Sequence, residues 1–305
     1  MTDAAATAGT TRARLRLGSC PDSWGVWFAD DPRQTPWHRF LDELAEAGYR
    51  WLELGPYGYL TTDPGRLREE VDRRGLRVSG QAVFGALHDP DRWEADLRDA
   101  RQVAELVAAV GAGHVVLLPA DAGPNPPELD DDQWRTLADA SNRLGRILQQ
   151  EYGLRAVFHP HADSVVRTQP QVERFLAETD PASVNLCLDT GHIAYYRGDN
   201  VELIRSYPDR IGYLHLKQAD PAVIEQVEAE GLGFAEAVRR GVMCEPPKGE
   251  PDPEALLDAV DRYLDGELFA IVEQDLYPCD PGVPLPIATR TYQYLRQLGV
   301  GSDAQ

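Results

Sequence analysis

Short apolar runs alternate with longer segments of helical spacing along almost the whole chain. Eight runs predict strands, at residues 14–20, 49–55, 76–84, 114–120, 154–162, 184–192, 210–217 and 268–275. Helical periodicity, or helix start and stop residues, marks the segments at 36–49, 63–75, 91–110, 131–151, 169–178, 201–207, 253–264 and 287–298. Such strict alternation predicts a parallel sheet with helices on its faces.

Eight strand–helix units predict an α/β fold of the (β/α)₈ TIM-barrel class, which typically takes about 250 residues. A doubly wound open sheet is the alternative, but the chain contains neither of the phosphate loops that usually accompany it, GxGxxG or GxxxxGK[ST]. No linker rich in Pro, Gly and Ser divides the chain, so we expect a single catalytic domain at 14–300 after a flexible N-terminal segment at 1–13. An insertion at about 218–252, between the seventh and eighth strands, has the length of functional or lid-like loops.

The charge balance narrows the classes of partner. The 305 residues include 30 Lys and Arg against 50 Asp and Glu, a formal net charge of −20. Such a surface repels phosphate backbones and anionic lipid, so we expect neither a nucleic-acid nor a membrane partner. The sequence begins without the pattern of a signal peptide and its four cysteines form no CxxC pair, so we expect reduced thiols and a cytoplasmic location.

Side chains that bind metals or move protons gather at the predicted carboxyl ends of the strands, where barrels of this class form their active sites. These residues are Glu53, Gln81, His159, His161, Asp189, His192, His215, Lys217, Glu273 and Asp275. Their concentration at one end predicts that this rim carries the chemistry.

Asp189, His215 and Glu273 are the strongest candidates for metal ligands. Each also has a structural interpretation: Asp189 can cap the following turn, Glu273 can pair with an arginine, and a lone histidine is often only hydrogen-bonded. Buried carboxylates are costly unless they are paired or bound to a metal, so several at one rim favour the metal site. Imidazole and carboxylate donors suit Mn, Fe, Co, Zn or Mg.

The aromatic residues after the first two strands have two interpretations. Trp24 and Trp27 follow the first strand, and Tyr57 follows the second. They form either an aromatic wall for a sugar ring or a hydrophobic plug at the barrel mouth. Glu53 and Gln81, at strand ends, are further candidates for contact with a substrate.

These strand ends resemble the xylose-isomerase-like superfamily of sugar isomerases, epimerases and related dehydratases, from GSCPDSW to IVEQD. The superfamily's Asp-x-x-His motif is matched by Asp189-Thr190-Gly191-His192, and its later histidine and glutamate ligands by His215 in HLK and Glu273 in VEQD. Within the superfamily, the segments WLELG, FHPHAD, CLDTGH and YLHLK look most like the inosose (2-keto-myo-inositol) dehydratases.

The resemblance implies one divalent metal ion, with Mn²⁺ or Co²⁺ expected first and Mg²⁺, Fe²⁺ or Zn²⁺ as alternatives. It implies four ligands, His159, Asp189, His215 and Glu273. The ketose 3-epimerases carry a glutamate at the end of the fifth strand, as ligand and acid–base residue, where this chain has His159. Because the symmetric pair of glutamates is missing, the sequence favours β-elimination over epimerisation.

We therefore predict a metal-dependent lyase that dehydrates a polyhydroxy cyclic ketone through an enediolate. A base removes the proton α to the ketone, and an acid protonates the departing β-hydroxyl. The catalytic candidates are Glu273, His161, His192 and Lys217, and the sequence leaves their roles as acid or base open. Lys217 is expected to have a lowered pKa beside the cation.

Two other functions remain open at this point. A sugar or sugar-phosphate isomerase or epimerase would use the same barrel, with Arg290, Arg197, Lys217 or Lys248 available to a phosphate. A non-catalytic sugar-binding barrel or partner subunit would keep the fold without the chemistry, although the intact candidate ligands argue against it. The resemblance also implies assembly as a homo-oligomer.

Overall fold

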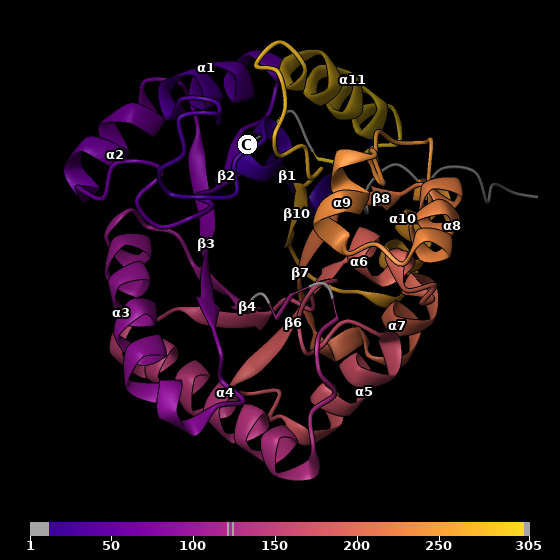
Figure 1. Cartoon of the computed structure of the whole chain (residues 1–305). Helices are drawn as coiled ribbons and strands as arrows, with labels where there is room; N and C mark the ends of the chain where they lie inside the picture. The colour runs from indigo at the N-terminus through magenta and orange to yellow at the C-terminus, as the bar shows by residue number, and fades with distance from the viewer. Residues whose placement is uncertain (1–11, 121, 124, 302–305) are drawn as a thin grey trace, which may run out of the picture.

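The computed structural model of this chain describes residues 12–301 except 121 and 124. Eight parallel strands close into a barrel in the order β1-β10-β7-β6-β5-β4-β3-β2 (Figure 1). The strands are β1 (Leu15–Ser19), β2 (Trp51–Glu53), β3 (Arg77–Gly85), β4 (His114–Pro119), β5 (Arg155–Phe158), β6 (Val184–Asp189), β7 (Ile211–Leu216) and β10 (Leu268–Val272). Each overlaps one of the eight predicted runs, and the predicted (β/α)₈ TIM-barrel class is confirmed.

Helices form a ring around the strands (Figure 1). They are α1 (Trp37–Ala47), α2 (Pro64–Asp72), α3 (Trp93–Ala109), α4 (Asp131–Tyr152), α5 (Gln169–Glu178), α6 (Thr190–Tyr195), α7 (Asn200–Ser206), α10 (Pro253–Tyr263) and α11 (Pro284–Gln297). Asp63, Asp130 and Asp252 each accept a hydrogen bond from a backbone N–H in the first turn of the helix that follows. The short helix α6 was not predicted, because it begins directly at the end of β6 and has room for less than two turns.

The core has two layers, which explains why the strands are apolar on both faces. A cluster inside the barrel contains Cys20, Ala82, Val116, Val157, Cys187, Tyr213, Phe269 and Ile271. A larger cluster lies between the strands and the helices. Because the barrel interior is filled, polar side chains on the strands converge mainly at the strand ends.

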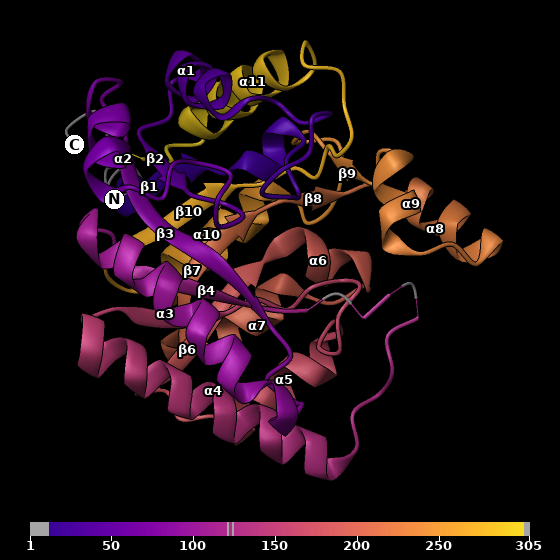
Figure 2. The same ribbon diagram turned by 60° about the vertical axis from the view of Figure 1, so that its left-hand side comes forward.

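The insertion at 218–252 is folded. β8 (Gln218–Ala219) pairs with β9 (Met243–Cys244) in an antiparallel sheet, and α8 (Pro221–Glu230) and α9 (Phe234–Arg239) lie between them in the chain. The two helices project from the side of the barrel, in orange in Figure 2. The sequence did not predict these elements, because they are short and bury their apolar residues, Phe234 among them, in a small separate cluster that they share with residues of α6 such as Tyr195.

The predicted flexible segment at 1–13 lies outside the described residues as far as residue 11, and the short turn η1 (Arg12–Arg14) follows it. Among the helices that the structure describes, none combines the length and the apolar character that crossing a bilayer requires.

Candidate active site and metal centre

A pocket of about 500 Å³ opens at the carboxyl ends of the strands. Its inner part is lined by buried polar residues from four strand ends, namely Glu53, His159, His215, Lys217, Glu273 and Asp275. A second hollow of about 590 Å³ lies at the opposite ends of the strands, where Arg16, His114 and Arg155 line it. The first pocket is the candidate active site, because barrels of this class place their chemistry at the carboxyl ends.

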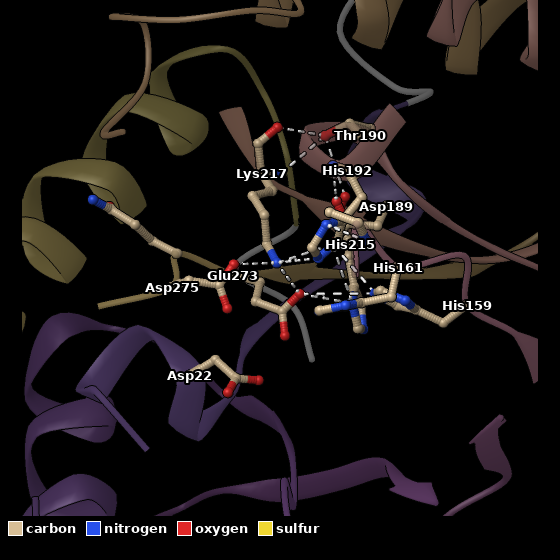
Figure 3. Close-up of polar contacts among 12 residues, drawn as sticks. Asp22, His159, His161, Asp189, Thr190, His192, His215, Lys217, Glu273 and Asp275 are labelled. Atoms are coloured by element: carbon tan, nitrogen blue, oxygen red, sulfur yellow. Dashed lines mark hydrogen bonds and ion pairs between the residues drawn. The ribbon is translucent and has the colours of Figure 1, made fainter. Parts of the chain in front are cut away.

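Four side chains from neighbouring strands surround one point in this pocket (Figure 3). His159 follows β5, Asp189 ends β6, His215 lies on β7 and Glu273 follows β10. All four are buried, and one ligand atom from each lies within 4.8 Å of every other. The parallel register aligns Asp189 directly with His215. These are the four residues that the sequence predicts as metal ligands.

The spacing of the ligand atoms fits a shared cation. His159 Nε2 lies 3.3 Å from Asp189 Oδ2, and His215 Nδ1 lies 3.0 Å from Glu273 Oε2. Ligand atoms about 2.1 Å from one ion are roughly 3 Å apart, so these separations suit a common metal. Asp189 Oδ2, His215 Nδ1 and Glu273 Oε2 are buried and have no hydrogen bond of normal geometry, and the two carboxylate oxygens lie within ion-pair distance of the Lys217 ammonium group. A set of buried nitrogen and oxygen donors that already attracts a cation fits a divalent metal ion.

The orientation of His215 is set by Glu53 at the end of β2. His215 Nε2 lies 3.0 Å from Glu53 Oε2, which leaves Nδ1 facing the other ligands. A carboxylate on the far nitrogen of a metal-binding histidine fixes its tautomer and ring orientation. Burial alone would lower the pKa of His215, but Cys187 and the carboxylates of Glu273 and Glu53 raise it well above its ordinary value.

Lys217 is buried among three carboxylates. Its Nζ lies 2.8 Å from Glu273 Oε2, 2.9 Å from Asp275 Oδ2 and 3.3 Å from Asp189 Oδ2 (Figure 3). Burial alone would lower the pKa of Lys217, but Asp189, Asp275 and Glu273 raise it well above its ordinary value. The carboxylates around the ammonium group outweigh its desolvation, and the lowered pKa of Lys217 beside a bound metal cation stays a prediction. Lys217 is a charged hydrogen-bond donor.

His161 lines the pocket from the loop after β5 and pairs with Asp163. Its Nδ1 lies 2.5 Å from Asp163 Oδ1. Burial would lower the pKa of His161, but the Asp163 carboxylate raises it above its ordinary value. Because Asp163 holds Nδ1, Nε2 is the nitrogen left for a substrate. Asp163 is missing from the sequence prediction, and its only signal is a carboxylate two residues after a histidine in FHPHAD.

His192, predicted as a catalytic candidate, is buried in α6 and is absent from the lining of the pocket. Its backbone N–H donates to Asp189 Oδ1 at 2.8 Å, and its Nε2 lies 3.2 Å from Lys217 Nζ. Burial, together with the charge of Lys217, lowers the pKa of His192 well below its ordinary value. Its contacts place it behind Asp189 and Lys217, where it supports both.

Comparison with known proteins agrees with this geometry. The model of the family described as xylose isomerase-like TIM barrel matches residues 41–264. The chain belongs to this family. The fold and the strand-end ligands of the xylose isomerase-like barrel were both expected from the sequence.

The curated relatives share one name. The chain is 34% identical to an inosose dehydratase of Geobacillus kaustophilus over 281 residues, covering 86% of this chain and 88% of that protein. It is 28% identical to an inosose dehydratase of Lacticaseibacillus casei over 284 residues, covering 88% of this chain and 92% of the relative. These matches run over nearly the full length of both proteins.

Solved structures share the fold at lower identity. A probable 3-DHS dehydratase, AsbF from Bacillus anthracis, superposes with a TM-score of 0.72 at 14% identity and covers 92% of this chain and 99% of its own. The IOLI protein, solved with a bound zinc atom, gives a TM-score of 0.70 at 14% identity, covering 93% and 98%. An L-ribulose 3-epimerase gives 0.69 at 18% identity, covering 93% and 94%.

Glu53 and Trp27 line the pocket, whereas four other predicted substrate contacts do not, namely Trp24, Gln81, Tyr57 and Arg290. Trp24 is fully buried, and its Nε1 donates to Glu43 Oε2 at 2.9 Å, as in the plug interpretation. Gln81 is also buried and donates to the Gly55 carbonyl at 3.2 Å. Two others lie outside this pocket: Tyr57 is 38% exposed, and Arg290 pairs with Glu245 at 2.7 Å.

Several residues of the pocket were not predicted from the sequence. Asp22 lies in the turn η2 (Pro21–Trp24), and Phe28, Phe84 and Tyr277 line the outer pocket together with Trp27. The sequence names Trp27 only as a partner of Trp24. The turn that follows β1 decides whether Trp24 or Trp27 faces the pocket. No local sequence pattern predicts the path of that turn.

Proposed function

We propose that this chain is a metal-dependent hydro-lyase that removes water from a polyhydroxy cyclic ketone of the inosose type. One observation carries the proposal: His159, Asp189, His215 and Glu273 meet at one point, and His161 and Lys217 border the same pocket. The relatives named inosose dehydratase support this substrate class.

The residues divide the chemistry between them. A divalent ion held by the four ligands would act as a Lewis acid toward the substrate carbonyl and stabilise the negative charge of the enediolate. His161, with Nδ1 held by Asp163, takes the α proton at Nε2. Lys217 gives a proton to the β-hydroxyl, which leaves as water. The enol product becomes the 1,2-dione by tautomerisation, and proton exchange with solvent restores both side chains.

The end of β5 favours elimination over epimerisation. An epimerase of this family removes a proton from one face of the carbon and returns one on the other face, with a pair of glutamates. Here the position after β5 holds His159, whose Nε2 lies 3.3 Å from Asp189 Oδ2 among the other ligands. Glu273 is therefore without a matching glutamate at the end of β5.

The first experiment is a paired assay on metal-stripped protein supplied again with Mn²⁺ or Co²⁺. The substrates are 2-keto-myo-inositol and a set of free ketoses in D₂O. We expect the absorbance of a conjugated dione to grow with the inosose and metal together, and with neither alone.

Deuterium entering a ketose without loss of water would contradict the proposal and identify an isomerase or epimerase. A protein that binds sugar but retains no metal and turns nothing over would be a non-catalytic barrel. The same proposal includes Mn²⁺ or Co²⁺ as the native ion and a cytoplasmic location. It also includes assembly as a homo-oligomer and the absence of a nucleic-acid partner.

A further inference from the structure

The pocket is larger than one substrate ring. Its volume is about 500 Å³. An inosose has 12 non-hydrogen atoms and fills on the order of 200 Å³ at the packing density of a protein interior. The metal ligands anchor the reacting ketone at the inner end, so the remaining space lies toward the solvent.

That outer space is lined by a wall of aromatic side chains, two of which are exposed in this chain. Phe28 is 49% and Phe84 is 51% exposed, and they are two of the four exposed large hydrophobic residues in the described part of the chain. Trp27 stacks on Tyr277 at 5.0 Å, and Phe28 packs edge-on against Tyr277 at 5.2 Å. Trp27 also donates from Nε1 to Asp275 Oδ1 at 3.3 Å, so this wall continues into the catalytic residues.

Two guanidinium groups border the same space. Arg239 comes from α9 in the insertion, and among the described residues it forms an ion pair with Glu236 of its own helix at 3.1 Å. Arg33 packs over the Tyr277 ring at 5.4 Å and pairs with Asp31. An exposed pair three residues apart is weak, so Arg239 is available to donate hydrogen bonds to a ligand.

We propose that this outer space is a second subsite that binds a sugar ring, so that the substrate is a cyclic ketone carrying an O-linked glycosyl group on a hydroxyl remote from the reacting carbons. The inference rests on the proposed function and deepens it. The apolar face of a pyranose covers the aromatic wall, and Arg239 donates to its hydroxyls. The carboxylate at this wall, Asp31, is paired with Arg33 and accepts a hydrogen bond from the Tyr277 hydroxyl at 2.7 Å, so the wall is suited to a neutral group.

The test compares 2-keto-myo-inositol with its O-galactosyl derivative on the metal-loaded protein. Covering an exposed aromatic side chain predicts a kcat/KM at least about tenfold higher for the glycosylated ketone. Phe84→Ala and Arg239→Ala should each reduce that selectivity ratio several-fold. Val283→Ala is the matched control, because Val283 is 39% exposed and lies outside this pocket.

Binding gives a readout that does not depend on turnover. Calorimetry with myo-inositol and O-galactosyl myo-inositol should show tighter binding of the larger ligand, lost in Phe84→Ala. If the glycosylated forms bind and turn over no better than the unglycosylated forms, the sugar subsite is overturned. If the protein instead prefers a phosphorylated ketone, the outer space binds an anion and not a sugar ring. If the galactosyl ligand binds tighter but neither ketone loses water, the subsite stands and the proposed dehydration fails.

Discussion

At the residue scale, the pairing of His161 with Asp163 decides which nitrogen the histidine offers to a substrate. Asp163 Oδ1 lies 2.5 Å from Nδ1 of His161, and the two side chains are 19% and 21% exposed. A carboxylate in this place holds one tautomer and stabilises the protonated ring that forms when the histidine accepts a proton. Asp163 lines the pocket beside His161 and positions it.

Asp163→Asn should lower kcat about a hundredfold with little change in KM, because the amide no longer stabilises the protonated ring. His161→Asn should cost at least as much, and the double variant no more than His161→Asn alone. Steady-state kinetics on inosose with saturating metal measures kcat and KM for the two single variants and the double variant. Asp89→Asn serves as the control, because Asp89 caps the short turn η3 (Pro90–Arg92). Additive losses in the double variant would show that Asp163 acts independently of His161.

At the scale of elements, the close approach of α4 to the start of β6 depends on Gly145. A Cβ atom built on Gly145 would lie 2.0 Å from the Ser183 carbonyl oxygen, far inside contact distance. β6 carries Asp189, a proposed metal ligand, at its other end. In the sequence, Gly145 appears only as a residue of low helix propensity inside a helix. In the structure it permits α4 to approach the start of β6.

Gly145→Ala should destabilise the protein by about 2–3 kcal/mol, because the backbone clash outweighs the roughly 1 kcal/mol that alanine gains in helix propensity. Urea unfolding followed by circular dichroism measures the free energy of unfolding. Gly113→Ala is the control, because its added Cβ meets no atom within 4 Å. An unchanged or higher stability of Gly145→Ala would mean that α4 shifts without cost.

Some of the helices and strands could be predicted from the sequence, and others could not. The eight barrel strands were predictable because burial on both faces makes each a continuous apolar run. The long helix α4 was predictable from its periodicity and its capping residue Asp130. The helices α6, α8 and α9 were not, because their apolar residues pack against one another and leave little periodic signal.

At the scale of the whole molecule, the proposed metal site joins the ends of four strands, β5, β6, β7 and β10, which are neighbours in the barrel. An ion bound there ties together elements from residue 155 to residue 273. Binding only to the folded barrel shifts the unfolding equilibrium by mass action.

Metal in thousandfold excess over its Kd should add about 4 kcal/mol of stability and raise the Tm by roughly 8 °C. Differential scanning calorimetry with Mn²⁺, Co²⁺, Zn²⁺ and a chelator measures the shift, and the order of the ions indicates the preferred metal. Asp189→Ala should lose both the metal-dependent shift and turnover. An Asp189→Ala protein that keeps the metal and its activity would remove Asp189 from the ligand set.

The sequence by itself determined the barrel, because the alternation of apolar runs and helices can be recognised from short stretches of residues. It also determined which residues end the strands, and parallel strands bring their carboxyl ends to one rim. Those rim positions indicated Asp189, His215 and Glu273, and the resemblance to the xylose-isomerase-like superfamily added His159 to the set that the structure brings together at one point. Only the tertiary structure decided that Glu53 holds His215, that three carboxylates keep Lys217 charged, and that Trp27 rather than Trp24 faces the pocket. Each of these depends on contacts between side chains far apart in the chain. Local sequence patterns do not predict such contacts.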